Sequence, residues 1–216
     1  MSKLPSDLQK KSTFHEIKNQ VSVCNLYIEI IKKTLAKENI ENDTVNRALD
    51  TISNSVKAIE SSMQELKAQF VPVNMKTIYL SPLINDVFLS CVSYADGKEI
   101  TFLNDVSENI NIVADRDKLY SVLINLCKNA VEAIEQNGEV KIYTDSDSLY
   151  IENNGRPIPE NVRNLIFEDG FTTKESGSGL GLMLVKKLLN SQHFDIELLS
   201  SNNCKTIFKI KNVTFC

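Results

Sequence analysis

The first third of the chain spaces its hydrophobic positions in steps of three and four residues. This spacing runs from residue 14 to 35, breaks at the polar stretch 37–44, and resumes from residue 45 to 70. Steps of three and four keep one narrow apolar stripe on the surface of a helix. The pattern therefore predicts two long helices joined by a short turn, an antiparallel hairpin that ends before Pro72.

A lone hairpin of this length leaves the flanks of both apolar stripes uncovered. A second copy of the chain would cover them, because two hairpins pack together as a four-helix bundle. We therefore expect a homodimer. The alternative is a hairpin that packs on the C-terminal part of its own chain.

Beyond the hairpin the pattern mixes two periods. Strand-like alternation and helical spacing alternate along the chain, which predicts an α+β sandwich with helices on one face of a mixed sheet. The sequence thus predicts a helical domain at 1–73 and a second domain at 74–216. The stretch 71–82 is expected to be a linker followed by the first strand of the second domain. The further expected strands are 98–106, 110–115, 139–153, 194–201 and 205–213, and the expected helices are 83–95, 117–136, 159–167 and 181–192.

Charge and composition limit the partners. The chain has 216 residues, a formal net charge of -4 and no sustained run of Lys or Arg, which argues against nucleic acid or an anionic membrane as a partner. Its five cysteines form no C-x-x-C pair and are typical of reduced thiols. No apolar run has the length of a membrane span, and the N-terminus lacks the apolar core of a signal peptide. We therefore expect a cytoplasmic protein.

Two asparagines stand four residues apart in the stretch "NLCKNA". Asn125 and Asn129 would project from the same face of the predicted helix. Amide oxygens are neutral, hard ligands that suit a magnesium ion already bound to the phosphates of a nucleotide. The alternative is a pair of polar residues on an exposed helix face, and the pair alone does not decide between the two.

Glycines gather in "GSGLGL", directly before a predicted helix. Three of the seven glycines in the chain stand there, at Gly177, Gly179 and Gly181. Unpaired N–H groups and the dipole at a helix start favour anions, and glycine lets a phosphate approach the backbone closely. The stretch lacks the preceding strand of a Rossmann motif and the Gly-Lys-Ser/Thr of a Walker loop. It indicates a phosphate site of another type.

The order of these stretches resembles that of a known family. "NLCKNA", "NNG" at 153–155, "IFEDGFTTK" at 166–174 and "GSGLGL" resemble the N, G1, F and G2 boxes of sensor histidine kinases, and "FHEIKNQ" at 14–20 resembles their H box. The resemblance covers about residues 78–213 as an ATP-binding domain of the GHKL (Bergerat) type. It implies a kinase of a two-component system that uses ATP and Mg²⁺ to phosphorylate its own histidine.

The resemblance also implies roles for single residues. His15 would accept the phosphoryl group, Glu16 would hold the proton of its other ring nitrogen, and Asn19 matches the residue that orients a hydrolytic water in bifunctional relatives. Asn129 would hold magnesium, with Asn125 assisting. The implied nucleotide contacts are Asn125, Asn129, Asn153, Gly155, Thr173, Lys174, Gly177, Gly179, Leu180 and Gly181.

The resemblance implies partners as well. The receiver domain of a response regulator would take the phosphoryl group from His15 onto an aspartate. A separate sensor protein or a small ligand would supply the input, because only a short polar stretch precedes the hairpin. The alternative is that the chain is the catalytic core of a longer kinase.

The chain departs from the family pattern in the G1 box. The family has an aspartate that accepts a hydrogen bond from the adenine amino group, and this chain has Asn153. An amide oxygen can accept the same bond, but without the charge that about doubles its strength. Two other functions therefore stay open: a histidine phosphotransfer relay with a degenerate nucleotide domain, and a binding protein that only senses nucleotide.

Overall fold

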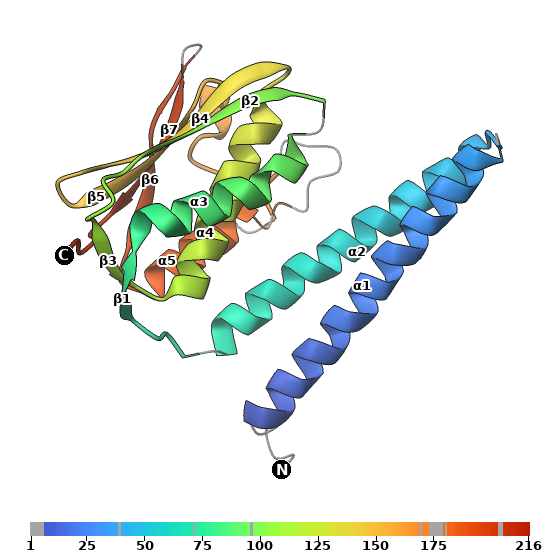
Figure 1. The fold of residues 1–216 in the computed structure, drawn as a ribbon, viewed down its shortest axis with the longest axis horizontal. Helices are drawn as coiled ribbons and strands as arrows, with labels where there is room; N and C mark the ends of the chain where they lie inside the picture. Colours follow the sequence, from blue (N-terminus) through green and yellow to red (C-terminus); the bar gives the residue numbers. More distant parts are fainter. Residues whose placement is uncertain are drawn as a thin grey trace. The chain divides into compact units, whose positions relative to one another are not determined.

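The computed structural model describes residues 7–38, 40–70, 72–95, 97–168, 170–172, 179, 181–202 and 205–216 (Figure 1). These residues divide into two compact units at the junction of residues 71 and 72. The first unit is helical, and the second combines helices with strands. Within the described ranges, no helix has both the length and the apolar character needed to cross a membrane.

The first unit is the predicted helical hairpin. It consists of α1 (Asp7–Lys37) and α2 (Asp43–Phe70). Asn42 caps the start of α2, because its Oδ1 accepts hydrogen bonds from the N–H groups of Thr44 at 3.0 Å and Val45 at 3.2 Å. The polar break in the sequence is therefore a turn with its own helix-start signal.

The two helices meet along one row of side chains from each. Val21 and Ile28 of α1 pack on Val56 of α2, and the half-buried Ile17 and Met63 extend this cluster. The packed residues Val21 and Ile28 are seven residues apart in α1, and Val56 and Met63 are seven residues apart in α2. Alternate members of each predicted stripe thus form the contact.

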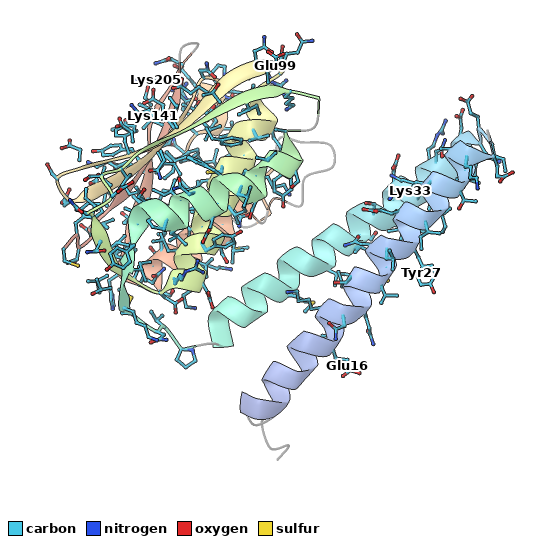
Figure 2. The ribbon with its side chains drawn as sticks, viewed as in Figure 1. Glu16, Tyr27, Lys33, Glu99, Lys141 and Lys205 are labelled. Carbon is cyan, nitrogen blue, oxygen red and sulfur yellow. The ribbon has the colours of Figure 1, made fainter. Side chains whose placement is uncertain are left out.

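Among the other described members of the predicted stripes, Leu49 is also buried and Leu35 and Val45 are half-buried. Cys24 and Ile31 of α1, and Ile52 and Ile59 of α2, are exposed in the single chain. Two helices in contact cover only the rows that face each other. Further exposed apolar side chains on α1 are Val23, Leu26, Tyr27 and Ile30. Figure 2 shows Tyr27 projecting from the hairpin.

The second unit contains the predicted mixed sheet. Its five strands are ordered β2-β4-β5-β7-β6, with β2 parallel to β4 and the other neighbours antiparallel. The bounds are Glu99–Asp105 for β2, Asn137–Asp145 for β4, Ser148–Asn153 for β5, Asp195–Ser201 for β6 and Thr206–Lys211 for β7. A separate antiparallel pair joins β1 (Lys76–Tyr79) to β3 (Asn111–Ala114).

Helices of the second unit cover one face of the five-stranded sheet (Figure 1). They are α3 (Leu80–Cys91), α4 (Arg116–Ala133) and α5 (Gly181–Asn190), and two short 3₁₀ turns are η1 (Val92–Tyr94) and η2 (Glu160–Val162). Buried apolar side chains between the sheet and these helices form the core: Val140, Ile142, Leu149, Ile151, Phe208 and Ile210 from the strands, and Leu119, Leu123, Leu126 and Leu189 from the helices.

The helix predicted at 159–167 is wrong beyond the short turn η2. Successive N–H groups here bond to carbonyls three residues back, as Val162 does to Pro159 at 3.2 Å, which is the 3₁₀ pattern. An α-helix would direct this N–H to the carbonyl of Ile158, which instead accepts Nε–H of Arg163 at 3.0 Å. A side chain therefore takes the acceptor that the first helical bond needs.

The face of the sheet away from the helices is polar. Tyr143 and Tyr150 stack on it with ring centroids 4.9 Å apart. Lys141, labelled in Figure 2, pairs with Asp105 at 2.7 Å. Burial, followed by the charge of Glu152, raises the pKa of Tyr143 to about 12. These groups satisfy one another on the outer face, so we place the candidate site on the helix-covered face.

Candidate active site

Helix α4 is the central element of the candidate site, and Asp115 fixes its N-terminus. The Asp115 carboxylate caps the helix by accepting the Lys118 N–H at 3.1 Å, and it also accepts the Asn74 N–H at 2.8 Å. The Asp115 N–H donates to Oε1 of the buried Gln192 at 2.7 Å. Three segments distant in sequence therefore meet at the start of α4.

One face of α4 carries the two predicted asparagines. Ser121, Asn125, Asn129 and Ala133 are spaced by four residues, so they form one row along the helix. All four are half-buried. The row is therefore open to a ligand on one side and supported by the protein on the other.

The start of α5 lies against the first of these asparagines. Asn125 Nδ2 donates to the carbonyl of Ser121 at 2.7 Å, which leaves Oδ1 as the available atom. A Cβ on Gly181, the first residue of α5, would lie 3.4 Å from this Oδ1. The structure thus brings an amide oxygen next to the unpaired N–H groups of a helix start, two features that were predicted from separate motifs.

The turn after β5 is fixed to the other end of the row. A Cβ on Gly155 would lie 2.7 Å from the carbonyl carbon of Ala133 and 2.8 Å from its oxygen, so only glycine fits. The Arg156 N–H donates to that oxygen at 2.9 Å. Asn154 Oδ1 accepts the Glu139 N–H at 2.8 Å and holds the turn on β4. The predicted turn therefore has one position relative to α4.

Asn153 is directed into the interior at this turn. The residue is 5% exposed, and its Oδ1 accepts the Gly155 N–H at 3.0 Å. In the register of β5 and β7, Asn153 lies opposite Thr206. The predicted adenine contact is thus a buried amide whose oxygen already has a partner within its own turn.

Position 179 also accommodates only glycine. Its φ is 69°, and a Cβ there would lie 2.4 Å from the carbonyl oxygen of Gly170. This close approach brings the G2 stretch onto the F stretch. Thr173, Lys174, Gly177 and Leu180 lie outside the described residues.

Sequence reasoning missed the residues that anchor the segment after Asn153. Ser201 Oγ accepts the Ile158 N–H at 2.8 Å and shares a hydrogen bond of 2.8 Å with Thr206 Oγ1. Arg163 donates from Nη2 to the Ser201 carbonyl. Ser and Thr at strand ends carry no motif, so no local signal identified them. They fix the beginning of the segment that leads to Gly170.

Cys127, between the two asparagines in sequence, points into the core instead. It is fully buried on α4 beside the buried Cys91 of α3. Its hydrogen bond with Cys91 and its burial raise the pKa of the Cys127 thiol, while the same bond lowers the pKa of Cys91. Both thiols pack α3 on α4 and stay apart from the open row.

The predicted phosphoacceptor region lies on α1. Glu16 and Asn19 are exposed there, and Figure 2 labels Glu16. His15 lies in the same helix, and its side chain is outside the described part of the chain. Residues 15 and 19 are one helical turn apart and so share a face of α1.

The length of the row on α4 gives the scale of the site. Asn125 and Ala133 are eight residues apart in the helix, which corresponds to about 12 Å. The glycine-bearing helix start lies at one end and the buried Asn153 turn at the other. An open cleft of about 910 Å³ adjoins the second end, with Ala133 and Gly155 in its walls.

Comparison with known proteins identifies the family. The family model described as "Histidine kinase-, DNA gyrase B-, and HSP90-like ATPase" matches residues 114–213, which contain α4, the Asn153 turn and α5. This part of the chain belongs to this family.

Two curated proteins that resemble the chain are kinases. The signal transduction histidine-protein kinase AtoS of Escherichia coli (strain K12) is 28% identical over 192 residues, which are 86% of this chain and 31% of AtoS. Sporulation kinase A of Bacillus subtilis (strain 168) is 30% identical over 204 residues, 91% of this chain and 32% of that protein. The chain thus spans about a third of the length of these relatives.

Solved structures of histidine kinase ThkA share the fold. A nucleotide-free form of the ThkA catalytic domain is 32% identical with a TM-score of 0.55, covering 64% of this chain and 98% of that domain. ThkA in complex with the response regulator protein TrrA is 26% identical with a TM-score of 0.60, covering 95% of this chain and 61% of ThkA. The predicted α+β fold of the GHKL type is confirmed.

Proposed function

We propose that the chain is the catalytic core of a cytoplasmic histidine kinase of a two-component system. It transfers the γ-phosphoryl group of ATP to His15 and then to an aspartate of a response regulator receiver domain. One observation carries the proposal: the start of α5 lies against Asn125 on the row that also holds Asn129. A helix start beside amide oxygens suits a metal-bound triphosphate.

The donor set fits magnesium. Asn125 has its Nδ2 bonded to Ser121, so Oδ1 is left as a ligand atom beside α5. Asn129 would be the main ligand and Asn125 would assist. Bound magnesium would neutralise charge on the phosphates, which is most of what phosphoryl transfer requires from its surroundings. The backbone at Gly177, Gly179, Leu180 and Gly181 would take the phosphates, with Thr173 and Lys174 as further contacts.

The acceptor chemistry belongs to α1. The outer ring nitrogen of His15 would form a P–N bond while the bond from the γ-phosphorus to the ADP oxygen breaks. Glu16, which is exposed next to His15 in sequence, would hold the proton of the other ring nitrogen. Asn19 would orient a water for a separate reaction, in which that water hydrolyses the phosphoryl group from a phosphorylated partner and releases inorganic phosphate.

The partners follow from the exposed surface and from one relative. The exposed stripe members Ile31, Ile52 and Ile59 would be covered by a second hairpin, so we propose a homodimer built on a four-helix bundle. ThkA, a histidine kinase, has been solved with a response regulator, which supports a receiver domain as the phosphoryl acceptor of this chain.

The test is labelling with γ-labelled ATP and Mg²⁺. We expect phosphate on the chain that is labile in acid and stable in base, and no label on His15→Ala. The matched control is His193→Asn, because His193 is the other histidine of the chain and its φ of 64° is tolerated by asparagine. Asn129→Ala should lose both labelling and magnesium-dependent binding.

Two results would overturn the proposal in different ways. If no nucleoside triphosphate labels His15 but a phosphorylated receiver domain does, the chain is a phosphotransfer relay. If ATP binds and neither donor labels His15, the chain is a nucleotide-sensing binding protein.

A further inference from the structure

The orientation of the Asn153 amide is fixed by its partner. The Gly155 N–H can only donate, so the atom that accepts it at 3.0 Å is Oδ1 and not Nδ2. The NH₂ group therefore occupies the other position of the amide. An aspartate in the same place would put a second acceptor oxygen there.

This NH₂ group has no hydrogen-bond partner among the described residues, although Asn153 is only 5% exposed. It is not among the side-chain atoms sealed from solvent without a partner, so water can still reach it. A ligand that displaces this water leaves the donor unpaired, which is costly unless the ligand supplies an acceptor. A ligand that binds here gains by presenting an acceptor to Nδ2.

The position of Asn153 shows which part of a nucleotide it meets. Its turn is fixed to Ala133, about 12 Å along α4 from Asn125 and the start of α5, counting eight residues. The phosphates belong at the α5 end. The base of the same nucleotide therefore lies at the Asn153 end, where the sheet and helices bury the amide.

We propose that Asn153 makes this site select nucleoside triphosphates with a 6-oxopurine base, hypoxanthine or guanine, over ATP. Adenine carries an amino group at C6, whose N–H bonds would oppose the donor of Asn153. A 6-oxopurine carries a carbonyl oxygen at C6, which accepts from Nδ2. The inference rests on the proposed function, since it assumes that the phosphoryl donor of the kinase binds along α4.

The experiment compares the affinities of the magnesium complexes of ITP, GTP and ATP by isothermal titration calorimetry on the full chain. ITP is the decisive probe, because hypoxanthine lacks the 2-amino group of guanine and carries the C6 carbonyl. ITP would form a hydrogen bond with Nδ2, whereas ATP would leave this donor unpaired. This difference predicts that ITP binds more tightly than ATP by about ten- to a hundredfold. Labelling of His15 by γ-labelled ITP should follow the same order.

The variant Asn153→Asp keeps the acceptor for the Gly155 N–H and replaces Nδ2 by an acceptor. It should reverse the preference, so that ATP binds more tightly than ITP. Asn154→Asp is the matched control, because it adds the same charge one residue away, where the side chain bonds to the Glu139 N–H. It should leave the ratio of the ITP and ATP affinities as in the wild type.

Failure of the inference and failure of the proposed function give different results. Wild type that binds ATP as tightly as ITP, or more tightly, overturns the base preference and leaves the kinase proposal intact. Absence of binding for every nucleotide, in wild type and in Asn153→Asp, overturns both. If thermal melting shows that Asn153→Asp is unfolded, the ratio of the ITP and ATP affinities of the wild type decides alone.

Discussion

The variant Gly155→Ala tests whether the turn at Asn153 is held against α4 by close backbone packing. The added Cβ would lie 2.7 Å from the Ala133 carbonyl carbon and 2.8 Å from its oxygen. These atoms belong to the helix backbone and cannot rotate away. The turn must therefore shift, and the bond from the Arg156 N–H to the Ala133 oxygen is lost or stretched.

The cost has two parts. Forced overpacking costs about 1–3 kcal/mol, and a lost backbone hydrogen bond costs about 1 kcal/mol more. We expect the second unit to lose about 3 kcal/mol of unfolding free energy, with a melting temperature lower by about 10 °C. Nucleotide affinity should fall as well, because Asn153 and Gly155 move together.

Tyrosine signals provide the assay. The chain has six tyrosines and no tryptophan, and only Tyr27 lies in the hairpin, so near-ultraviolet circular dichroism follows the second unit through urea denaturation. Gly97→Ala is the control, since its φ of 72° strains alanine but the added Cβ meets nothing within 4 Å. It should cost about 1–2 kcal/mol, from the backbone alone. A Gly155→Ala protein within about 0.5 kcal/mol of wild type would refute the packing argument.

Three further predictions concern the rest of the chain. Asp115→Ala removes the acceptor for the Lys118 and Asn74 N–H groups, and it should lower the unfolding free energy measured in urea by about 2 kcal/mol. Asp115→Asn keeps an acceptor and should lower it less. Equal losses in the two variants would contradict the capping role. In alkaline titration, Tyr143→Phe should remove the tyrosinate step near pH 12. The folded pKa of about 12 is above the ordinary tyrosine value of 10.0, so the stabilisation is complete below pH 10 and is lost between pH 10 and 12. If Tyr143→Phe instead removes a step near pH 10, the tyrosine is not buried as described. Ile52→Asp should convert the proposed dimer to a monomer in sedimentation velocity, and a variant that still dimerises would show that another surface is used.

The local parts of the site were predictable because each has a short-range physical signal. Asn125 and Asn129 share a helix face through their spacing, and the glycines before α5 mark a helix start. The proximity of Asn125 to Gly181 was not predictable, since it depends on how α4 packs on α5. The same holds for Gly155, whose conflict is with Ala133 and not with a neighbour in its own turn.

The hairpin shows a different limit of pattern reading. Steps of three and four identify a stripe, but they do not tell which members face the adjacent helix. The structure buries Val21, Ile28 and Val56 and leaves Cys24, Ile31, Ile52 and Ile59 exposed. The spacing of hydrophobic residues is set within one helix, whereas the residues that become buried depend on how the two helices pack together.

Helix α4 is fixed at both ends, and this has a consequence for ligand entry. Asp115 holds its start, while Nζ of Lys98 donates to the Val131 and Ile134 carbonyls at its end, at 2.9 and 2.6 Å. A cation on the last carbonyls also favours the helix dipole. If the proposed nucleotide site is correct, the row on α4 spans the distance from the phosphates to the base, and a fixed α4 would keep both ends of that site in register. Opening of the site would then come from elements other than α4.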